Sequence, residues 1–246
     1  MSTLDGKIAL VTGASRGIGK AIAIAYAREG AAIGCAARTV ADTRATVMEI
    51  EKVGGRGLAI QTDVTDQRSV EHMVEATVSE FGGLDILVAN AGGNFDHSTV
   101  EEGATADWLS TLEVNLTGAY YSAKAAIPHL KRRGAGKIIT VGSGVGHNGR
   151  VASSAYACSK AGLWMLTRVL AQELWRYNIS VNELIPGPVS SAMTRETRAR
   201  RSDSVFAIES EWLKEPEDVA PLALFLATQP DTGPTAQSFS LMRRDG

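Results

Sequence analysis

The feature that most restricts what this chain can fold into is the regular alternation of short apolar runs with longer amphipathic segments. The apolar runs, such as "KIALVTG" and "LDILVANAG", contain few polar residues. Strands of this kind are buried on both faces and are typical of parallel sheets that helices cover on each side. Because crossovers between parallel strands are right-handed, the alternation predicts an α/β fold, a doubly wound (Rossmann-type) parallel sheet of about seven strands with helices on both faces.

Periodicity and end signals place the individual elements. Strands are expected at 7–13, 31–38, 56–64, 84–92, 136–143, 179–187 and 237–242. Helices are expected at 16–30, 41–55, 67–83, about 106–131, about 154–177 and 216–229, with irregular chain or short helices at 190–212. Asp66 is expected to cap the third helix, and Pro216 stands at the first position of the last. No composition shift or repeat interrupts the pattern, so we expect a single domain, 1–246.

Composition restricts the cellular locations and the classes of partner that we expect for the chain. Its formal net charge is -2, so no general attraction to nucleic acid or to anionic membranes is expected. The start "MSTLDGKIALVTG" lacks a signal-peptide pattern, and no apolar run reaches the roughly 20 residues that span a bilayer. A cytoplasmic location is the resulting expectation. Cys35 and Cys158 show no metal-ligand spacing, so we expect no metal site and interpret both as small buried hydrophobic residues.

A glycine-rich loop separates the first expected strand from the first expected helix. The stretch "TGASRGIG", 12–19, contains Gly13, Gly17 and Gly19. Glycine permits a tight turn and a close backbone approach to a pyrophosphate, and the N-terminus of the following helix offers free N–H groups and a positive dipole end. A glycine triplet by itself also fits a flexible connection. In this strand–loop–helix setting we favour dinucleotide binding.

The same loop resembles the cofactor loop of the short-chain dehydrogenase/reductase family, and the resemblance extends over nearly the whole chain. Asp63–Val64 is similar to the family's adenine-contacting pair, and "ANAG", 89–92, is similar to its N-N-A-G motif with Ala89 in place of the first asparagine. "PGPVSS", 186–191, is similar to the nicotinamide-side motif, with Ser191 where threonine is usual. The resemblance implies an oxidoreductase with the catalytic residues Asn115, Ser143, Tyr156 and Lys160.

Tyr156 and Lys160 lie four residues apart on an expected helix, so both side chains emerge on one face. A tyrosine with an ordinary pKa of about 10 is a poor acid–base group at neutral pH, and an adjacent ammonium lowers that pKa by favouring the phenolate. Ser143 is placed to hydrogen-bond a substrate oxygen, and the resemblance implies that Asn115 holds a water beside the lysine. A Tyr-x-x-x-Lys spacing alone also occurs on ordinary helix surfaces. The four residues therefore indicate a catalytic site only when they occur together.

Arg38 ends the second expected strand, where a chain that selects NAD carries an acid for the ribose 2′-hydroxyl. An arginine instead suits the 2′-phosphate of NADP, and Arg16 in the glycine loop supplies a second cation. The alternative is a surface arginine at a strand end. We expect NADP(H) as the cofactor, held by Gly13, Ser15, Arg16, Gly17, Ile18, Gly19, Arg38, Thr39, Asp63, Val64, Asn90, Gly92, Tyr156, Lys160, Pro186, Gly187, Val189 and Ser191.

Three segments are expected to line the substrate site: 92–98, 144–150 and, by resemblance to the family, a lid at about 188–214. His147 in the second segment either touches the substrate or is a solvated loop residue. Four arginines of the lid form either a solvated helix face or a site for an anionic group, such as a phosphopantetheine, coenzyme A or a carboxylate. They are Arg195, Arg198, Arg200 and Arg201.

The expected function is the NADPH-dependent interconversion of a carbonyl and a secondary alcohol on a small molecule, with Tyr156 as the acid/base. One alternative is 3-oxoacyl-(acyl carrier protein) reductase, because "KRRGAGKIITVGS" resembles that branch and three arginines suit a carrier: Arg132, Arg133 and Arg176. Tyr177 departs from the branch, since a basic residue is often found there. Sugar or polyol dehydrogenase and a dinucleotide-binding sensor are further alternatives. The resemblance also implies a homo-oligomer, commonly a tetramer built on two long helices.

Overall fold

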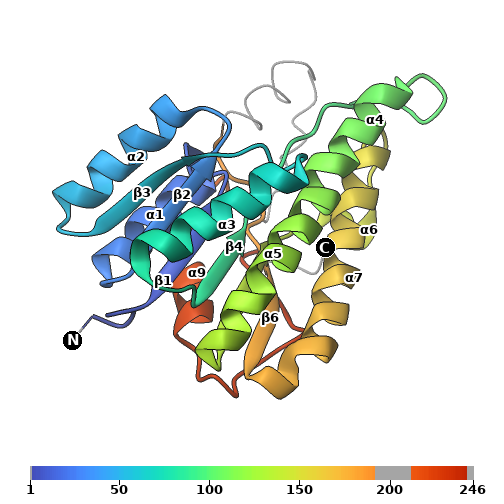
Figure 1. The fold of residues 1–246 in the computed structure, drawn as a ribbon. Helices are drawn as coiled ribbons and strands as arrows, with labels where there is room; N and C mark the ends of the chain where they lie inside the picture. Colours follow the sequence, from blue (N-terminus) through green and yellow to red (C-terminus); the bar gives the residue numbers. More distant parts are fainter. Residues whose placement is uncertain (1, 192–211, 243–246) are drawn as a thin grey trace.

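The computed structural model describes residues 2–191 and 212–242, and one parallel sheet organises them (Figure 1). Its strand order is β3-β2-β1-β4-β5-β6-β7, and every pairing is parallel. The strands are β1 Ile8–Thr12, β2 Ala32–Ala37, β3 Arg56–Gln61, β4 Ile86–Ala89, β5 Gly136–Val141, β6 Ile179–Ile185 and β7 Ser238–Ser240. The predicted fold class, a doubly wound parallel sheet, is therefore confirmed.

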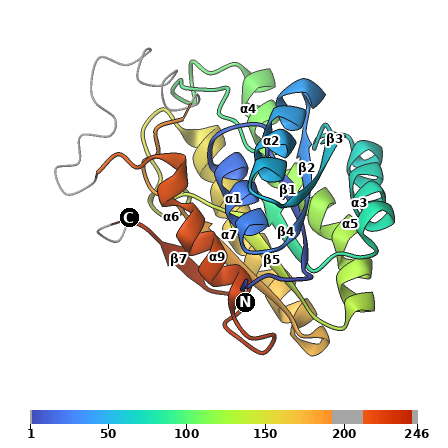
Figure 2. The ribbon, with the colours of Figure 1, turned by 90° about the vertical axis from the view of Figure 1, so that its left-hand side faces the viewer.

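Two groups of helices cover the two faces of the sheet, and each group encloses its own apolar core (Figure 2). One face is covered by α1 Gly17–Arg28, α2 Val40–Lys52 and α9 Ala220–Thr228, and the other by α3 Gln67–Phe81, α5 Gly118–Arg133 and α7 Ser154–Leu174. Tyr26 of α1 is fully buried and donates a hydrogen bond from its hydroxyl to Ala223 O of α9 at 2.7 Å. This covering on both sides explains why the strand sequences are almost continuously apolar.

The helix expected at about 106–131 is divided into three parts. α4 Thr105–Leu112 is followed by a π-helical turn, η1 Glu113–Thr117, and then by α5. The helix expected at about 154–177 is α7 followed by a 3₁₀ turn, η2 Trp175–Tyr177. The segment from Pro216 likewise opens with a 3₁₀ turn, η3 Pro216–Asp218, before α9. Periodicity alone does not distinguish such turns from α-helix, because the shift of register that they introduce is small.

The predictions about individual residues and element boundaries can also be compared with the structure. The predicted cap of α3 is confirmed, because the Asp66 side chain accepts a hydrogen bond from Arg68 N at 2.9 Å. β7 is shorter than the expected strand at 237–242. Cys35 is buried as expected, but the same expectation for Cys158 is wrong, because that residue is exposed. Cys158 lies two positions after Tyr156 on α7, and such residues point to different sides of a helix.

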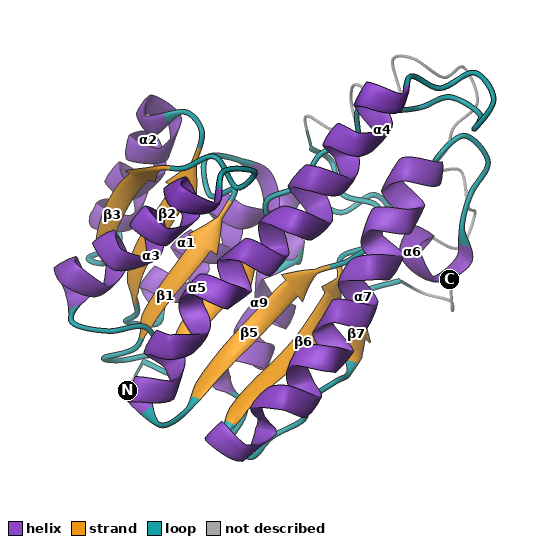
Figure 3. Cartoon of the chain, turned by 45° about the vertical axis from the view of Figure 1, so that its right-hand side comes forward, coloured by secondary structure: helices purple, strands orange, loops and turns teal. Residues whose placement is uncertain are grey.

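The carboxyl ends of the strands form one edge of the sheet, and the order reverses between β1 and β4 (Figure 3). In doubly wound folds, ligands bind in the crevice at this switch point. The glycine loop follows β1 there, and the segments after β4, β5 and β6 reach the same edge. Within the described residues, no helix is long and apolar enough to cross a membrane, and no group of His, Cys, Asp and Glu side chains is suited to hold a metal ion.

Candidate active site

The glycine loop after β1 is shaped by backbone demands that only glycine meets. Gly13 and Gly17 have positive φ angles of 68° and 58°, a region that favours glycine. A Cβ atom on Gly19 would overlap Gly13 O and the Asn90 amide. The loop ends at the N-terminus of α1, whose first turn contains no acidic residue. It therefore presents free N–H groups and a positive helix end to an anion.

Thr12, at the end of β1, joins this loop to the segment after β4. Its buried hydroxyl accepts hydrogen bonds from the N–H groups of Asn90 and Ala91, each at 3.0 Å. In return, Asn90 Nδ2 donates to Thr12 O at 2.8 Å. These three bonds fix the predicted cofactor residue Asn90 against the glycine loop. Ala89, the departure from the family motif, is buried in a small cluster with Ala119 and Leu163.

Asn115 occupies the π-helical turn and is 1% exposed. Its Oδ1 accepts from Gly93 N at 2.8 Å, and its Nδ2 donates to Gly93 O at 2.8 Å and to Ser159 Oγ at 2.9 Å. The side chain thus ties the segment after β4 to α7. π-helical turns are frequent at functional sites because they displace the backbone locally. The sequence indicated Asn115 but not the turn that carries it.

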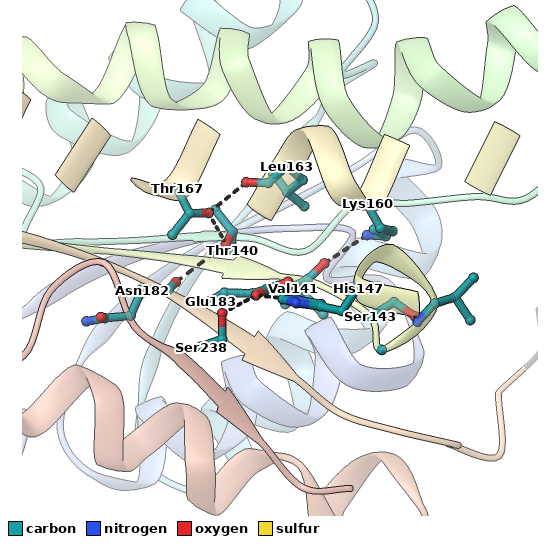
Figure 4. A network of polar contacts seen from close by, with 12 residues as sticks. Thr140, Val141, Ser143, His147, Lys160, Leu163, Thr167, Asn182, Glu183 and Ser238 are labelled. Atoms are coloured by element: carbon teal, nitrogen blue, oxygen red, sulfur yellow. Dashed lines mark hydrogen bonds and ion pairs between the residues drawn. The ribbon is translucent and has the colours of Figure 1, made fainter. Parts of the chain in front are cut away.

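Tyr156 and Lys160 project from the same side of α7, with Lys160 Nζ 5.7 Å from the centre of the Tyr156 ring. Lys160 is 4% exposed, and its Nζ donates to Val141 O of β5 at 2.8 Å (Figure 4). Ser143 follows β5 and hydrogen-bonds the Tyr156 side chain, which lowers the pKa of that phenol. The structure therefore brings together the predicted serine, tyrosine and lysine at the carboxyl edge of the sheet.

Burial acts in opposite directions on the two titratable groups. It raises the pKa of Tyr156 above the ordinary value, against the lowering effect of Ser143. It lowers the pKa of Lys160 to about 8, against the raising effect of the Glu183 carboxylate. A protonated phenol and a lysine that titrates close to physiological pH are thus adjacent. Such a pair is suited to give a proton to a developing alkoxide and to recover it afterwards.

A family model described as short chain dehydrogenase matches residues 7–202 of the chain. The chain belongs to the short-chain dehydrogenase family. The resemblance noted in the sequence is thereby confirmed.

Individual members of the family match almost the whole of this short-chain dehydrogenase. The 3-oxoacyl-(acyl carrier protein) reductase FabG of Vibrio cholerae is 35% identical over 226 residues, which cover 92% of this chain and 91% of the relative. The short-chain reductase NovJ of Streptomyces niveus is 37% identical, covering 92% and 88%. A crystal structure of a short-chain type dehydrogenase/reductase from Mycobacterium marinum superposes with a TM-score of 0.90 at 34% identity, covering 96% and 94%.

The adenosine end of the predicted cofactor site is more open than the catalytic end. Arg16, Arg38 and Thr39 are exposed, at the glycine loop and at the carboxyl end of β2. The pKa of Asp63 is lowered mainly by a hydrogen bond from Thr65 N–H, with a smaller contribution from the positive charge of Arg38. Arg38 and Asp63 are therefore electrostatic neighbours. Val64, the partner of Asp63 in the motif, is buried.

The segment predicted to lie on the nicotinamide side follows β6. Gly187 has a φ of 69°, and a short parallel bridge joins Val189 to Lys214. Ser190 N donates to Lys214 O at 2.7 Å, so the chain on both sides of residues 192–211 is held together. Most of the predicted lid at about 188–214, with Arg195, Arg198, Arg200 and Arg201, lies outside the described residues.

His147 is an exposed residue, and its imidazole also contacts a buried acid that the sequence analysis did not consider. It lies on the short helix α6 Val145–Asn148, and its Nε2 is 3.0 Å from Oε2 of Glu183 on β6. The imidazole therefore points into the protein, although its side chain is 23% exposed. Sequence reasoning missed Glu183, although the signal was available as an acid inside a strand that is buried along its whole length.

Proposed function

We propose that this protein is an NADPH-dependent oxidoreductase that interconverts a carbonyl and a secondary alcohol. The observation that carries the proposal is the meeting of Ser143, Tyr156 and Lys160 beside the glycine loop, at the switch point of the sheet. The glycine loop suits a dinucleotide, because it follows β1 and leads into the N-terminus of α1, and because Cβ atoms at Gly13 and Gly19 would clash with Asn90 and so prevent its compact form. The names of the relatives, two of them reductases, point in the same direction.

The residues divide the work as follows. NADPH, when bound, supplies a hydride to the carbonyl carbon. Ser143 donates a hydrogen bond to the carbonyl oxygen, and Tyr156 gives its phenolic proton to that oxygen as negative charge develops. The Lys160 ammonium stabilises the resulting phenolate, and Asn115 fixes the backbone beside the lysine. In alcohol oxidation each proton moves in the opposite direction.

The choice of NADPH over NADH rests on the two exposed cations at the adenosine end. Arg38 follows β2 and Arg16 lies in the glycine loop, and two arginines from separate loops suit a ribose 2′-phosphate. The cofactor contacts assigned above from the sequence, from Gly13 to Ser191, form part of the proposal. The electrostatic neighbourhood of Arg38 and Asp63 places the cation next to the predicted adenine-contacting pair.

A 3-oxoacyl thioester on an acyl carrier protein is the second candidate substrate, because several relatives are named as reductases of that group. The basic residues suggested for a carrier lie far from Tyr156. Arg176 follows the end of α7, whose 21 residues extend over roughly 30 Å. Arg133 already forms a salt bridge, with its Nε 2.9 Å from Oδ1 of Asp85. An acyl carrier protein that binds these arginines therefore contacts the side of the molecule away from Tyr156.

The proposed activity is tested by following NADPH consumption with a panel of carbonyl compounds. The panel contains small ketones, sugars, 3-oxoacyl-coenzyme A and a 3-oxoacyl group on an acyl carrier protein. Turnover of any member supports the proposal, and preference for the carrier-bound substrate selects the second candidate. Tight NADPH binding without turnover of any member indicates instead a dinucleotide sensor.

We also propose a homo-oligomer, with a tetramer as the family expectation. Exposed apolar side chains on α4, α5 and α7 support an interface on these helices: Leu109, Tyr120, Met165 and Val169. Light scattering coupled to size-exclusion chromatography measures the mass directly. A monomeric mass at micromolar concentration contradicts this part of the proposal.

A further inference from the structure

A buried acid lies directly beneath the catalytic residues. Glu183 of β6 is 0% exposed, although parallel strands in this position carry few charges. Its Oε2 accepts a hydrogen bond from Ser238 Oγ at 2.6 Å and lies 3.0 Å from His147 Nε2. Because a carboxylate only accepts hydrogen bonds, Nε2 of His147 carries the proton in this pair. A fully buried acid is costly to retain even with two hydrogen-bonding partners, which points to a role for it.

The backbone around Ser143 is built to accommodate this acid. A Cβ atom on Gly142, the residue before Ser143, would overlap Oε1 of Glu183. A Cβ atom on Gly146 would lie 2.8 Å from Cβ of Lys160, so α6 packs closely against α7 at the catalytic lysine. The segment that begins at Ser143 is therefore fixed by Glu183 on one side and by Lys160 on the other (Figure 4).

We propose that Glu183 is a positioning residue of this active site. Through His147 it holds the helix that follows Ser143, and its carboxylate lies against Gly142, next to Val141, whose carbonyl accepts the hydrogen bond of Lys160. This inference rests on the proposed carbonyl-reducing function. The hydrogen bond to Ser238 fixes the carboxylate from the side of β7, and the contact with His147 fixes α6. His147 also packs on Trp164, one turn after Lys160 on α7, with ring centres 5.0 Å apart.

The charge of Glu183 matters because burial works against the ammonium. Burial lowers the pKa of Lys160 to about 8, and the Glu183 carboxylate raises it. The charged and titratable side chains that meet around this point come from α6, α7 and β6: His147, Tyr156, Lys160 and Glu183. Of these groups, the Glu183 carboxylate is the one that raises the pKa of Lys160.

The direct test is a titration of Lys160 that needs neither substrate nor cofactor. In protein with ¹³C-labelled lysine, the Lys160 Cε signal is assigned by its loss in Lys160→Arg and followed by NMR as the pH is raised. The wild-type midpoint is expected at about 8. Glu183→Gln retains the shape but removes the charge, so its midpoint is expected about one pH unit lower. An unchanged midpoint in Glu183→Gln overturns the electrostatic part of the proposal.

Ser238→Ala is the matched control for this titration. It removes a hydrogen bond from the same carboxylate but leaves the charge, so its Lys160 midpoint is expected to stay at the wild-type value. If Glu183→Gln does not fold, Glu183→Asp replaces it, with a charge that is retained but cannot reach both partners. Its midpoint is expected to fall by less than about half a pH unit. A larger fall contradicts the proposal, because the charge is still present.

The anchoring role is tested by kinetics at His147. His147→Ala is expected to lower kcat for carbonyl reduction about tenfold, because the segment after Ser143 loses its anchor. The pH at which kcat/KM declines on the alkaline side should stay unchanged. His147→Gln retains a donor toward Glu183 and should recover most of kcat. Wild-type kcat in His147→Ala overturns the anchoring role. A wild-type enzyme that reduces no carbonyl refutes the proposed function, and the titration still decides the electrostatic part.

Discussion

The two ends of the candidate site differ in how the protein holds their side chains. At the catalytic end, Lys160 and Asn115 are 4% and 1% exposed, and hydrogen bonds tie each to a neighbouring element. At the adenosine end, Arg16 and Arg38 are exposed on two separate loops. The proposed catalytic groups are therefore positioned before a ligand arrives, whereas the two arginines retain the freedom of long surface side chains.

This difference follows from what each end has to do. Proton transfer requires heavy atoms within hydrogen-bonding distance and suitable pKa values, which packing and burial supply in advance. Recognition of a phosphate at the surface requires charge of the right sign, and a flexible guanidinium adapts to it at a modest entropic cost. Substitutions at the catalytic end should therefore change rates strongly, while those at the adenosine end should change selectivity more modestly.

The largest effect is expected for Tyr156→Phe. Without the phenolic proton, kcat for carbonyl reduction should fall by roughly 10²–10⁴-fold, while NADPH binding measured by fluorescence is retained. Tyr177→Phe is the matched control, because it removes the same hydroxyl from an exposed aromatic residue. Full activity in Tyr156→Phe refutes the assigned acid/base.

A smaller effect is expected for Arg38→Asp, which places a second acid beside Asp63. The acid should repel a 2′-phosphate and accept a hydrogen bond from a ribose 2′-hydroxyl, so the ratio of kcat/KM for NADPH to that for NADH should fall at least about tenfold. Lys52→Asp makes the same change of charge at the exposed C-terminal end of α2 and should leave the ratio unaltered. An unchanged ratio in Arg38→Asp argues against NADPH selection by this residue.

The sequence predicted the general fold well and the local distortions poorly. The parallel sheet, the two helical layers and the cap at Asp66 follow from patterns that depend on neighbouring residues and on the handedness of crossovers. The π-helical turn around Asn115 does not, because its register shift leaves the apolar periodicity almost intact. The contact of His147 with Glu183 joins α6 to β6 over 36 residues, and no local pattern specifies a contact of that range. The exposed position of Cys158 depends on which face of α7 packs against the sheet, and the amino-acid composition of that helix did not define this face.

Thr12→Val tests the connection between the two ends of the site, because Thr12 hydrogen-bonds the segment after β4 from the start of the glycine loop. Valine retains the shape but removes the hydroxyl that accepts from Ala91 N–H and Asn90 N–H, of which the latter keeps only its bond to Val88 O at 3.1 Å. The free energy of unfolding, measured in urea, should fall by about 1–3 kcal/mol. Thr12→Ser retains the hydroxyl and should lose less than half of that. A larger loss in Thr12→Ser than in Thr12→Val indicates that the methyl group rather than the hydrogen bonds provides most of the stability.

The smallest effect is expected for Arg16→Ala, and it sharpens the comparison most. If both arginines contact one 2′-phosphate, Arg16→Ala should raise KM for NADPH about threefold and leave KM for NADH unchanged. Combined with Arg38→Ala, it should then add less than its effect alone, because the phosphate has already lost one of two cooperating partners. Full additivity shows that the two cations act on the cofactor independently. An equal rise for both cofactors assigns Arg16 to the pyrophosphate instead, which both cofactors share.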